Sequence, residues 1–332
     1  MIDTKESGKR SYLLSIACGK SQAKLIKTAR NLGFGVIAVD QGDCICSVDE
    51  HIKLSTYNPK PILASIDKLL CGGLNIVGVL ARSSGPAVLT GNQVAEYLSL
   101  PRCGEPIARS SNSKLDLYQI FSGYDIPLIP TIQICTESSD ILLWEKIIIK
   151  PDVSVMGKKD IFVLPKSKEQ RKGLYHKSKR TSLNGRVVAQ PYIEGRDIGL
   201  GVLSHEGSVL WHTAYEESVV WSNYSIASSK MNAIDAADIE DVQTKMLGVV
   251  SRIVEISQAS GFAFFSFRVR EDKSCFLYEI NPGLVGDSLI DSVFFKQFPT
   301  IDFYQAEIYA LIKGSLKKTL NEEINAGPSE DK

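Results

Sequence analysis

Residues 278–283 have the sequence Tyr-Glu-Ile-Asn-Pro-Gly and close an apolar run that is typical of a β-strand. Successive side chains of a strand point to opposite faces, so Glu279 and Asn281 are expected to present their oxygen atoms on the same face. Paired oxygen ligands at this spacing suit Mg2+, held partly by the protein and partly by phosphate. A pair of surface residues on an edge strand would have the same sequence. This motif alone therefore does not distinguish a magnesium site from a surface pair.

Two segments upstream also combine the end of a strand with polar groups. Proline stops the apolar run 146–150 after Lys150, which leaves the lysine amine at the strand end. Together with Gly157-Lys158-Lys159, this lysine would suit a polyphosphate, and a surface lysine at a strand end is an equally good interpretation. Residues 190–197, Gln-Pro-Tyr-Ile-Glu-Gly-Arg-Asp, break a second strand, either to expose backbone groups to a flat heterocycle or to form an interdomain hinge.

The first hundred residues alternate short apolar runs with helical spacing, which predicts a parallel sheet with right-handed crossovers, a small Rossmann-like unit. Strands are expected at 12–17, 35–39 and 76–80, and helices at 21–32, 59–70 and 86–98. Two nucleotide motifs are incomplete: Leu14 stands where a P-loop needs glycine, and no glycine fingerprint precedes Asp40, which argues against NAD. Residues 83–86, Ser-Ser-Gly-Pro, would form either an anion site or a plain helix cap.

The rest of the chain mixes strands and helices without an internal repeat. Strands are expected at 146–150, 161–164 and 186–190, hairpins at 198–203 with 208–214 and at 262–270 with 275–280, and helices at 113–122, 238–260 and 301–314. The segment 165–183 is strongly basic, with Glu169 as its one acid. A solvated helix face is favoured there, and polyanion binding is the alternative.

The composition is that of an ordinary soluble globular protein of 332 residues, with 44% apolar and 23% charged residues. Lys plus Arg equals Asp plus Glu at 38 each, and a net charge of zero argues against a protein that coats nucleic acid or anionic membrane. The sequence has no run of about 18 apolar residues that could span a membrane. We expect a first strand rather than a signal peptide near the start.

The seven cysteines are an odd number and lie mostly in apolar segments. We therefore expect buried free thiols in a reducing cytoplasm. Cys44-x-Cys46 followed by His51 is a metal-binding pattern that lacks a second ligand pair, which argues against a metal site there.

The order of these features is more specific than any one of them. A lysine-ended strand, a polar loop, a broken strand, a hairpin, a long helix and a Glu-x-Asn strand follow one another as in the ATP-grasp superfamily, which the chain resembles over about residues 12–315. The junction 79–130, with LSLPRCGEP and IPLIPT, is similar to that of carbamoyl-phosphate synthetase, biotin carboxylase and L-amino-acid ligases.

The resemblance implies an α/β ATP-grasp fold, in which an N-terminal Rossmann-like parallel sheet domain precedes two α+β lobes that enclose ATP. The implied boundaries are 1–108 for the first domain, 109–193 for a central lobe with a lid loop at 152–160, 194–318 for a C-terminal lobe with the metal site, and 319–332 for a disordered tail.

The resemblance also implies ATP and Mg2+ as cofactors and gives individual residues a role. Lys114 and Lys150 would bind the ATP phosphates with Lys158 of the lid, Gln190 and Ile193 would form the hinge that pairs with adenine, Asp197 would bind the ribose hydroxyls, and Glu279 and Asn281 would hold Mg2+.

The chain departs from the family pattern at three positions. Asp160 stands where the lid has glycine, Ser266 where a first metal carboxylate is common, and Gly283 where an arginine is frequent. Arg268 lies two residues from Ser266, on the same strand face, and could supply the missing positive charge. Lys150 and Arg268 are therefore the expected catalytic residues.

The resemblance implies an ATP-dependent ligase that activates a small-molecule carboxylate as an acyl phosphate and joins it to an amine or thiol, releasing ADP and phosphate. Substrate contacts are expected from 82–86 and 215–230, which are interpreted as loops.

The departures keep a second interpretation open, a degenerate ATP-grasp protein that binds a nucleotide or small ligand without turnover. A partner-binding subunit that uses the basic segment 166–180 is a third. The first interpretation implies small-molecule carboxylate and amine partners, no nucleic acid, no membrane and a cytoplasmic location, and it leaves a homodimer open.

Overall fold

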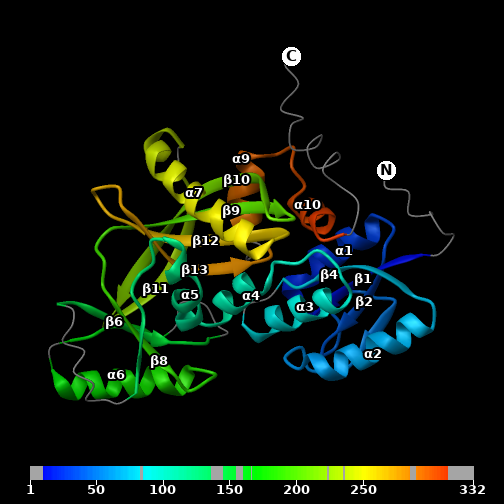
Figure 1. Ribbon diagram of the computed structural model, residues 1–332, viewed down its shortest axis with the longest axis horizontal. Coiled ribbons are helices and arrows are strands. Elements are labelled where there is room, and N and C mark those ends of the chain that lie inside the picture. Colours follow the sequence, from blue (N-terminus) through cyan, green and yellow to red (C-terminus); the bar gives the residue numbers. More distant parts are fainter. Residues whose placement is uncertain are drawn as a thin grey trace.

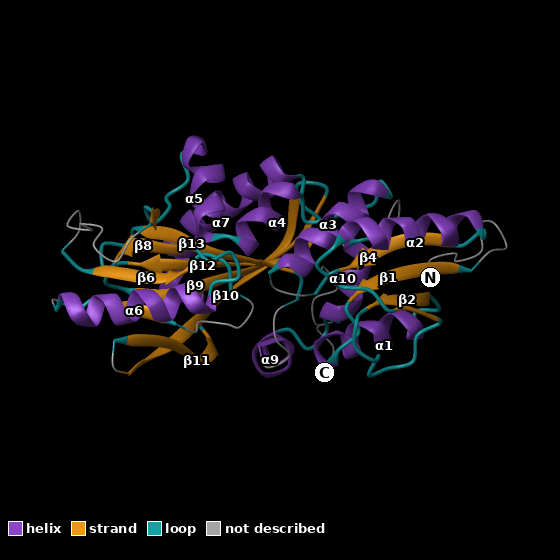
Figure 2. Cartoon of the chain, turned by 90° about the horizontal axis from the view of Figure 1, so that it is seen from below, coloured by secondary structure: helices purple, strands orange, loops and turns teal. Residues whose placement is uncertain are grey.

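The computed structural model describes residues 10–82, 85–135, 145–154, 160–165, 167–222, 224–234, 236–284 and 289–312. Residues 83–84, most of the expected lid loop with Lys158, and the expected tail 319–332 lie outside the described residues. Within the described part, the strands form a four-stranded and a nine-stranded sheet toward opposite ends of an elongated molecule (Figure 1). Helices cover both sheets, which confirms the α/β class (Figure 2). No helix in the described ranges is long and apolar enough to span a membrane.

The four-stranded sheet is parallel and has the order β3-β2-β1-β4. Its strands are β1 (Ser11–Ile16), β2 (Gly35–Val39), β3 (Glu50–Ile52) and β4 (Asn75–Leu80), and its helices are η1 (Lys20–Gln22), α1 (Ala23–Asn31), α2 (Pro59–Cys71) and α3 (Pro86–Tyr97). β2 is buried along its whole length, as expected for a strand with helices on both faces. The predicted alternation is confirmed, whereas the sequence does not predict β3 because Glu-His-Ile has no apolar run.

The nine-stranded sheet is antiparallel and has the order β13-β12-β9-β10-β11-β7-β6-β8-β5. Its strands are β5 (Ile132–Ile134), β6 (Ile147–Pro151), β7 (Ile161–Val163), β8 (Val187–Pro191), β9 (Arg196–His205), β10 (Ser208–Ser222), β11 (Ser225–Ala233), β12 (Gly261–Val269) and β13 (Cys275–Pro282). Both predicted hairpins are present.

The expectation that 215–230 is a loop is wrong. β10 continues to Ser222 and pairs with β11, and β11 then pairs with β7. The hairpin of β10 and β11 therefore joins the strands before residue 191 to those after residue 196 in one continuous sheet. The sequence Ser225–Ala233 is polar and has no apolar alternation, so local patterns do not predict a strand there. Hydrogen bonds from the neighbouring strands keep it extended.

β12 is buried on both faces, which explains its Phe-rich sequence. Phe265 and Phe267 pack with the helices on one face, which are α4 (Glu105–Asn112), α5 (Lys114–Phe121), η3 (Ala236–Ile239) and α7 (Glu240–Ser257). The short η2 (Ser122–Tyr124) follows α5. Phe262 and Phe264 pack on the other face with Trp211 and with η4 (Ile290–Phe294), α9 (Phe295–Gln297) and α10 (Phe303–Ala310).

The chain end after β13 connects the two sheets. α10 packs against both α1 and β12, and Ile312 forms a β-bridge with Gly78 of β4. Arg82 follows β4, is buried, and donates from Nε to the carbonyl of Leu284 at 2.7 Å. The Gln22 side chain donates to the Arg82 carbonyl at 2.7 Å. These contacts fix the segment just after β13 to the N-terminal sheet.

The basic segment forms α6 (Lys168–Thr181), which confirms the predicted helix. α6 packs on β6 and β8 through Tyr175, while Lys172, Lys179 and Arg180 are exposed. Lys177 is also exposed and lies 3.7 Å from Asp160. The charged residues therefore form a solvated face of the helix.

The expectation of free thiols throughout is wrong for two of the cysteines. Cys18 and Cys44 form a disulfide, with their Cα atoms 5.0 Å apart. Their 26-residue separation carries no signal in the sequence, because only the parallel sheet brings the end of β1 beside the loop after β2. The expected burial is also wrong for Cys71 and Cys135, which are exposed free thiols.

Replacing Gly104 by alanine should destabilise the fold. Gly104 precedes α4 with a φ of +82°, and a Cβ there would lie 2.0 Å from the Ser257 carbonyl oxygen at the end of α7. Backbone strain and overpacking each cost roughly 1–3 kcal/mol, so the free energy of unfolding should fall by at least about 2 kcal/mol in urea titrations.

Gly173→Ala is the matched control, because Gly173 is exposed in α6 and a Cβ there meets nothing within 4 Å. It should stabilise the protein by roughly 0.5–1 kcal/mol. A Gly104→Ala protein as stable as wild type would contradict the close approach of α4 to α7.

Candidate functional site

The nine-stranded sheet curls so that strands far apart in its order approach each other. β6 and β13 are separated by five other strands, yet the Lys150 amine lies 5.6 Å from the centre of the Tyr278 ring. The connection to β5 runs beside β13: the Leu277 amide donates to the Pro127 carbonyl at 2.8 Å, and the Ile129 amide donates to the Leu277 carbonyl at 3.3 Å. Polar residues of β6 and β13 therefore meet in one place.

Asp152, directly after β6, organises the start of α5. Its carboxylate has no exposed surface and accepts hydrogen bonds from the Ser113 hydroxyl at 2.8 Å and from the Leu115 amide at 3.0 Å. The Asn184 side chain donates to the second carboxylate oxygen at 2.7 Å. The network fixes the N-terminus of α5 to the end of β6. The sequence patterns do not predict a role for Asp152. The one feature that could have indicated it is the position of an acid directly after Lys150-Pro151.

Lys114 is held over this network. Its amine donates to the Asp152 carbonyl oxygen at 3.0 Å. Burial lowers the pKa of Lys114 below its ordinary value, and the Glu279 and Asp152 carboxylates oppose that shift. An additional anion beside the amine would restore the preference for the charged form.

Lys150 ends a strand whose neighbours are buried, and the lysine itself is 6% exposed. The aromatic face of Tyr278 is close to its amine, and such a face attracts a cation. Lys114, Lys150 and Glu279 thus converge from α5, β6 and β13. The sequence places these residues up to 165 positions apart, and only the curl of the sheet brings them together.

A β-bulge shapes the polar face of β13. Ser266 lies opposite Glu279 and Phe267 opposite Leu277, so Tyr278 is the inserted residue. Asn281 lies opposite Phe264, on the same face as Glu279. Glu279 and Asn281 are half-buried, while Ser266 is 5% exposed. The face therefore carries a carboxylate and an amide, with a hydroxyl beside the carboxylate.

The residues expected to form the hinge lie at the end of β8. Gln190 is buried, and its side-chain amide donates to the Thr131 hydroxyl at 2.7 Å. The Tyr192 amide donates to the Lys146 carbonyl at 2.8 Å, and the Lys146 amine lies 3.8 Å from the centre of the Tyr192 ring. Ile193 follows in the half-buried connection to β9.

Asp197 and Arg268 form a buried pair beside this connection. They lie opposite each other on β9 and β12, and an Arg268 nitrogen is 3.4 Å from an Asp197 oxygen. Arg268 also donates to the Gly195 carbonyl at 2.9 Å and lies 5.7 Å from the centre of the Tyr192 ring. Glu217 of β10 lies opposite Asp197 on its other side. Arg268 thus fixes the connection between β8 and β9, and its expected catalytic role near Ser266 stays a prediction.

Comparison with known proteins relates this architecture to solved structures. No family model and no curated protein matches the chain. Phosphoribosylglycinamide synthetase from Anaerococcus prevotii is 16% identical with a TM-score of 0.63, over 85% of this chain and 70% of that one. L-Amino acid ligase from Bacillus licheniformis is 15% identical with a TM-score of 0.68, over 90% and 72%. The biotin carboxylase domain of Hydrogenobacter thermophilus 2-oxoglutarate carboxylase is 14% identical with a TM-score of 0.70, over 92% and 70%.

The chain has the ATP-grasp fold. The TM-scores of 0.63–0.70 show this fold, and at identities of 14–16% they show the fold alone.

The local backbone accounts for two departures from the ATP-grasp pattern. Asp160 has a φ of +57°, the left-handed conformation that a glycine would supply, and its carbonyl accepts from the Ser178 hydroxyl at 2.8 Å. Gly283 has a φ of +76°, and a Cβ there would lie 3.2 Å from the Ala81 carbonyl oxygen. The close approach of β4 therefore favours glycine at 283 over the larger arginine.

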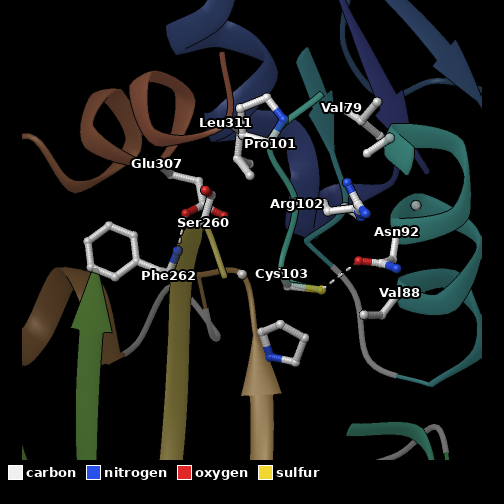
Figure 3. Close-up of a pocket in the computed structure, with 15 residues that line it drawn as sticks. Val79, Val88, Asn92, Pro101, Arg102, Cys103, Ser260, Phe262, Glu307 and Leu311 are labelled. Atoms are coloured by element: carbon white, nitrogen blue, oxygen red, sulfur yellow. Dashed lines mark hydrogen bonds between the residues drawn. The ribbon is translucent and has the colours of Figure 1, made fainter. Parts of the chain in front are cut away.

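A small cavity of about 30 Å3 lies between α3, β12 and α10 (Figure 3). The Cys103 thiol faces Asn92 at 3.6 Å, and burial raises its pKa to about 12, so it stays protonated. Glu307 is 3% exposed and accepts from the Phe262 amide at 2.6 Å. Burial raises the pKa of Glu307 from 4.5 to about 7, although the Phe262 amide and Arg82 oppose the shift.

Glu307 should make stability fall as pH rises. Its folded pKa is above its unfolded value, so the folded state binds the proton more tightly. The resulting stabilisation is complete below pH 4.5 and is lost as pH rises through about 7. Relative to Glu307→Gln, the wild type should lose up to about 3 kcal/mol of unfolding free energy across this window, measured by urea titration at several pH values.

Glu105→Gln, at an exposed acid of α4, is the control and should leave the wild-type pH profile unchanged. If wild type and Glu307→Gln show parallel profiles between pH 5 and 8, Glu307 does not hold a proton in the folded state.

Proposed function

We propose that this protein is an ATP-dependent ligase that activates a small-molecule carboxylate as an acyl phosphate and joins it to an amine or thiol, releasing ADP and phosphate. The observation that carries the proposal is the convergence of Lys114, Lys150 and Glu279 at the curl of an ATP-grasp sheet. The similar solved structures support it, because one is an L-amino acid ligase and two others hold MgADP or ADP.

The lysines would bind the phosphates of ATP. Transfer of the γ-phosphoryl group needs neutralisation of charge more than covalent help, and fixed cations in a partly buried site supply it. Lys114 is fixed by Asp152, and Lys150 by its place in β6. Lys158, in the lid loop, would add a third positive charge. The hinge, with Gln190 and Ile193, would pair with adenine, and Asp197 would take the ribose hydroxyls.

The polar face of β13 fits a magnesium ion. Glu279 and Asn281 offer a carboxylate and an amide oxygen on one face, and both are hard ligands that remain accessible. When bound, Mg2+ would neutralise phosphate charge. The residues of this chain would do the rest: Lys150 would balance the charge that builds on the transferred oxygens, and Arg268 would keep the hinge connection in place.

The chemistry follows from these positions. A carboxylate oxygen of the substrate forms a bond to the γ-phosphorus as the bond to the β-phosphate oxygen breaks, giving an acyl phosphate and ADP. The amine or thiol then attacks the acyl carbon, inorganic phosphate leaves, and the nucleophile releases its proton. Exclusion of water by the lid 152–160 would protect the acyl phosphate from hydrolysis.

The proposal includes the organisation expected from the sequence: a domain at 1–108, a central lobe at 109–193, a C-terminal lobe at 194–318 and a tail at 319–332. It also includes a cytoplasmic location and small-molecule carboxylate and amine partners. A homodimer is part of it too, since the biotin carboxylase domain from Hydrogenobacter thermophilus is a dimer in its solved structure.

One observation favours a second candidate function, binding of nucleotide without turnover. Ser266 lies directly opposite Glu279, so the strand next to β13 contributes a hydroxyl and no carboxylate. A site with one carboxylate, one amide oxygen and several waters still suits Mg2+, which retains water readily. We therefore favour turnover and propose binding alone as the alternative.

Lys150→Met should weaken ATP binding while preserving side-chain volume in the buried strand. Loss of a charge-assisted hydrogen bond costs roughly 1.5–3 kcal/mol, so the dissociation constant should rise roughly tenfold to a hundredfold in calorimetric titrations. Lys68→Met, at an exposed lysine of α2, is the matched control and should bind ATP as wild type does. Unchanged ATP affinity in folded Lys150→Met would rule out the assignment.

Glu279→Gln should abolish ADP formation, because it removes the carboxylate of the proposed metal site while the lysines still bind ATP. The assay is a magnesium titration of ADP release with a mixture of amino acids as carboxylates and amines, in wild type, Glu279→Gln and Ser266→Asp. Turnover by wild type alone, or by wild type and Ser266→Asp, supports the ligase.

Two results would contradict this assignment in different ways. If only Ser266→Asp forms ADP, the natural chain is a binding protein. If wild type and Glu279→Gln form ADP at equal rates, the protein is an enzyme, but Glu279 is not a ligand of its metal.

A further inference from the structure

Three potential metal ligands meet at one edge of the N-terminal sheet, apart from the residues of the proposed ATP site. The Sγ atoms of Cys18 and Cys44 and a ring nitrogen of His51 lie within 4.8 Å of one another. Cys44 and His51 belong to the pattern that lacks a second ligand pair in the sequence. Cys18 supplies the missing ligand from a distant position, at the end of a neighbouring strand.

Parallel pairing explains the convergence. β1, β2 and β3 run in the same direction, so the residues that follow β1 and β2 meet at the same edge. Hydrogen bonds fix the group: the Cys18 amide donates to an Asp40 carboxylate oxygen at 3.0 Å, and the Ile45 amide donates to the Cys18 carbonyl at 3.2 Å. The cluster therefore rests on three strands and the loop 40–49, and not on one mobile side chain.

The histidine is oriented in the way that metal-binding histidines are. Its Nε2 lies 3.1 Å from the Asp40 carbonyl oxygen, which can only accept, so Nε2 carries the proton. Nδ1 is then the nitrogen with a free lone pair. A ring N–H that donates to a backbone carbonyl is the usual outer contact of a histidine ligand, because it fixes the tautomer and the ring plane.

We propose that Cys18, Cys44 and His51 form a zinc site when the disulfide is reduced. Two thiolates and an imidazole are a ligand set that zinc prefers, and three protein ligands leave the fourth tetrahedral position for water or an exogenous ligand. Bonds of about 2.3 Å to zinc would separate the two sulfurs by roughly 3.7 Å. Cys18 is fully buried, so Cys44, half-buried in the loop between β2 and β3, is the residue that would move to reach this separation.

Reduction of the disulfide comes before metal binding. An external phosphine or dithiol gives two electrons to the Cys18–Cys44 bond and is itself oxidised, and two protons convert the sulfurs to thiols. Zinc binding then releases those two protons as the thiols become thiolates, while neutral His51 binds through its lone pair. The oxidised protein has no thiolate at this site, so the disulfide and the metal exclude each other.

The test uses the full chain in its oxidised and phosphine-reduced forms, freed of reductant without air. Cobalt(II) is added first, because tetrahedral thiolate coordination gives intense visible bands, and zinc is then added to displace it, with affinity measured by calorimetry. Reduced wild type should bind one zinc that oxidised wild type does not bind. Cys44→Ala and His51→Ala should each weaken that binding at least about tenfold. Both replaced residues are only half-buried, so these variants can be tested without changing Cys18.

Cys71→Ser is the matched control, because Cys71 is an exposed free thiol at the end of α2, and Cys46→Ser tests the neighbouring half-buried thiol. Both should bind zinc as wild type does. The proposal is overturned if reduced wild type binds no more zinc than the oxidised form, or if Cys44→Ala and His51→Ala bind it unchanged. Loss in Cys46→Ser with retention in Cys44→Ala would also overturn it, because the ligand would then be Cys46.

Discussion

A lysine amine inside a protein needs nearby anions or acceptors, and this requirement links three separate parts of the chain. Lys114 at the start of α5 depends on the carbonyl of Asp152 after β6 and on the carboxylate of Glu279 in β13. Asp152 in turn fixes the helix start through its carboxylate. The curl of the nine-stranded sheet, the orientation of α5 and the bulge in β13 are therefore parts of one electrostatic arrangement, and a bound polyphosphate would complete it.

Much of this fold is predictable from the sequence, since its long elements have strong periodicity. β12 and β13, α7 and the N-terminal strands carry apolar patterns that local rules detect. β3, β5 and β11 are short or polar and depend on hydrogen bonds from their neighbours, so local patterns do not reveal them. Within the site, Lys150, Glu279 and Asn281 stand out at strand ends. Asp152 does not, because its partners Ser113 and Asn184 are distant in sequence.

Of the three departures from the family pattern, two concern the shape of the backbone and one concerns charge. Asp160 adopts the backbone conformation of the glycine it replaces, and Gly283 lies against β4 where a side chain would be crowded. The overall scaffold thus tolerates both residues. Ser266 is different, since it removes a carboxylate beside Glu279 while leaving the strand register intact. In the proposed ligase, Glu279 would therefore be the carboxylate that supplies negative charge to the metal.

The cysteine cluster and the proposed ATP site consist of different residues, but the chain segments that follow each of them are joined through Arg82. Cys18 and Gln22 both lie in the connection between β1 and α1, and Gln22 donates to the Arg82 carbonyl. Arg82 donates to the carbonyls of Ser21 and Leu284, and Leu284 follows Asn281 by three residues. Hydrogen bonds of Arg82 thus connect the chain segment just after Cys18 to the segment just after β13. Because Arg82 is buried and hydrogen-bonded on both sides, one side chain fixes both the connection after Cys18 and the segment after Asn281.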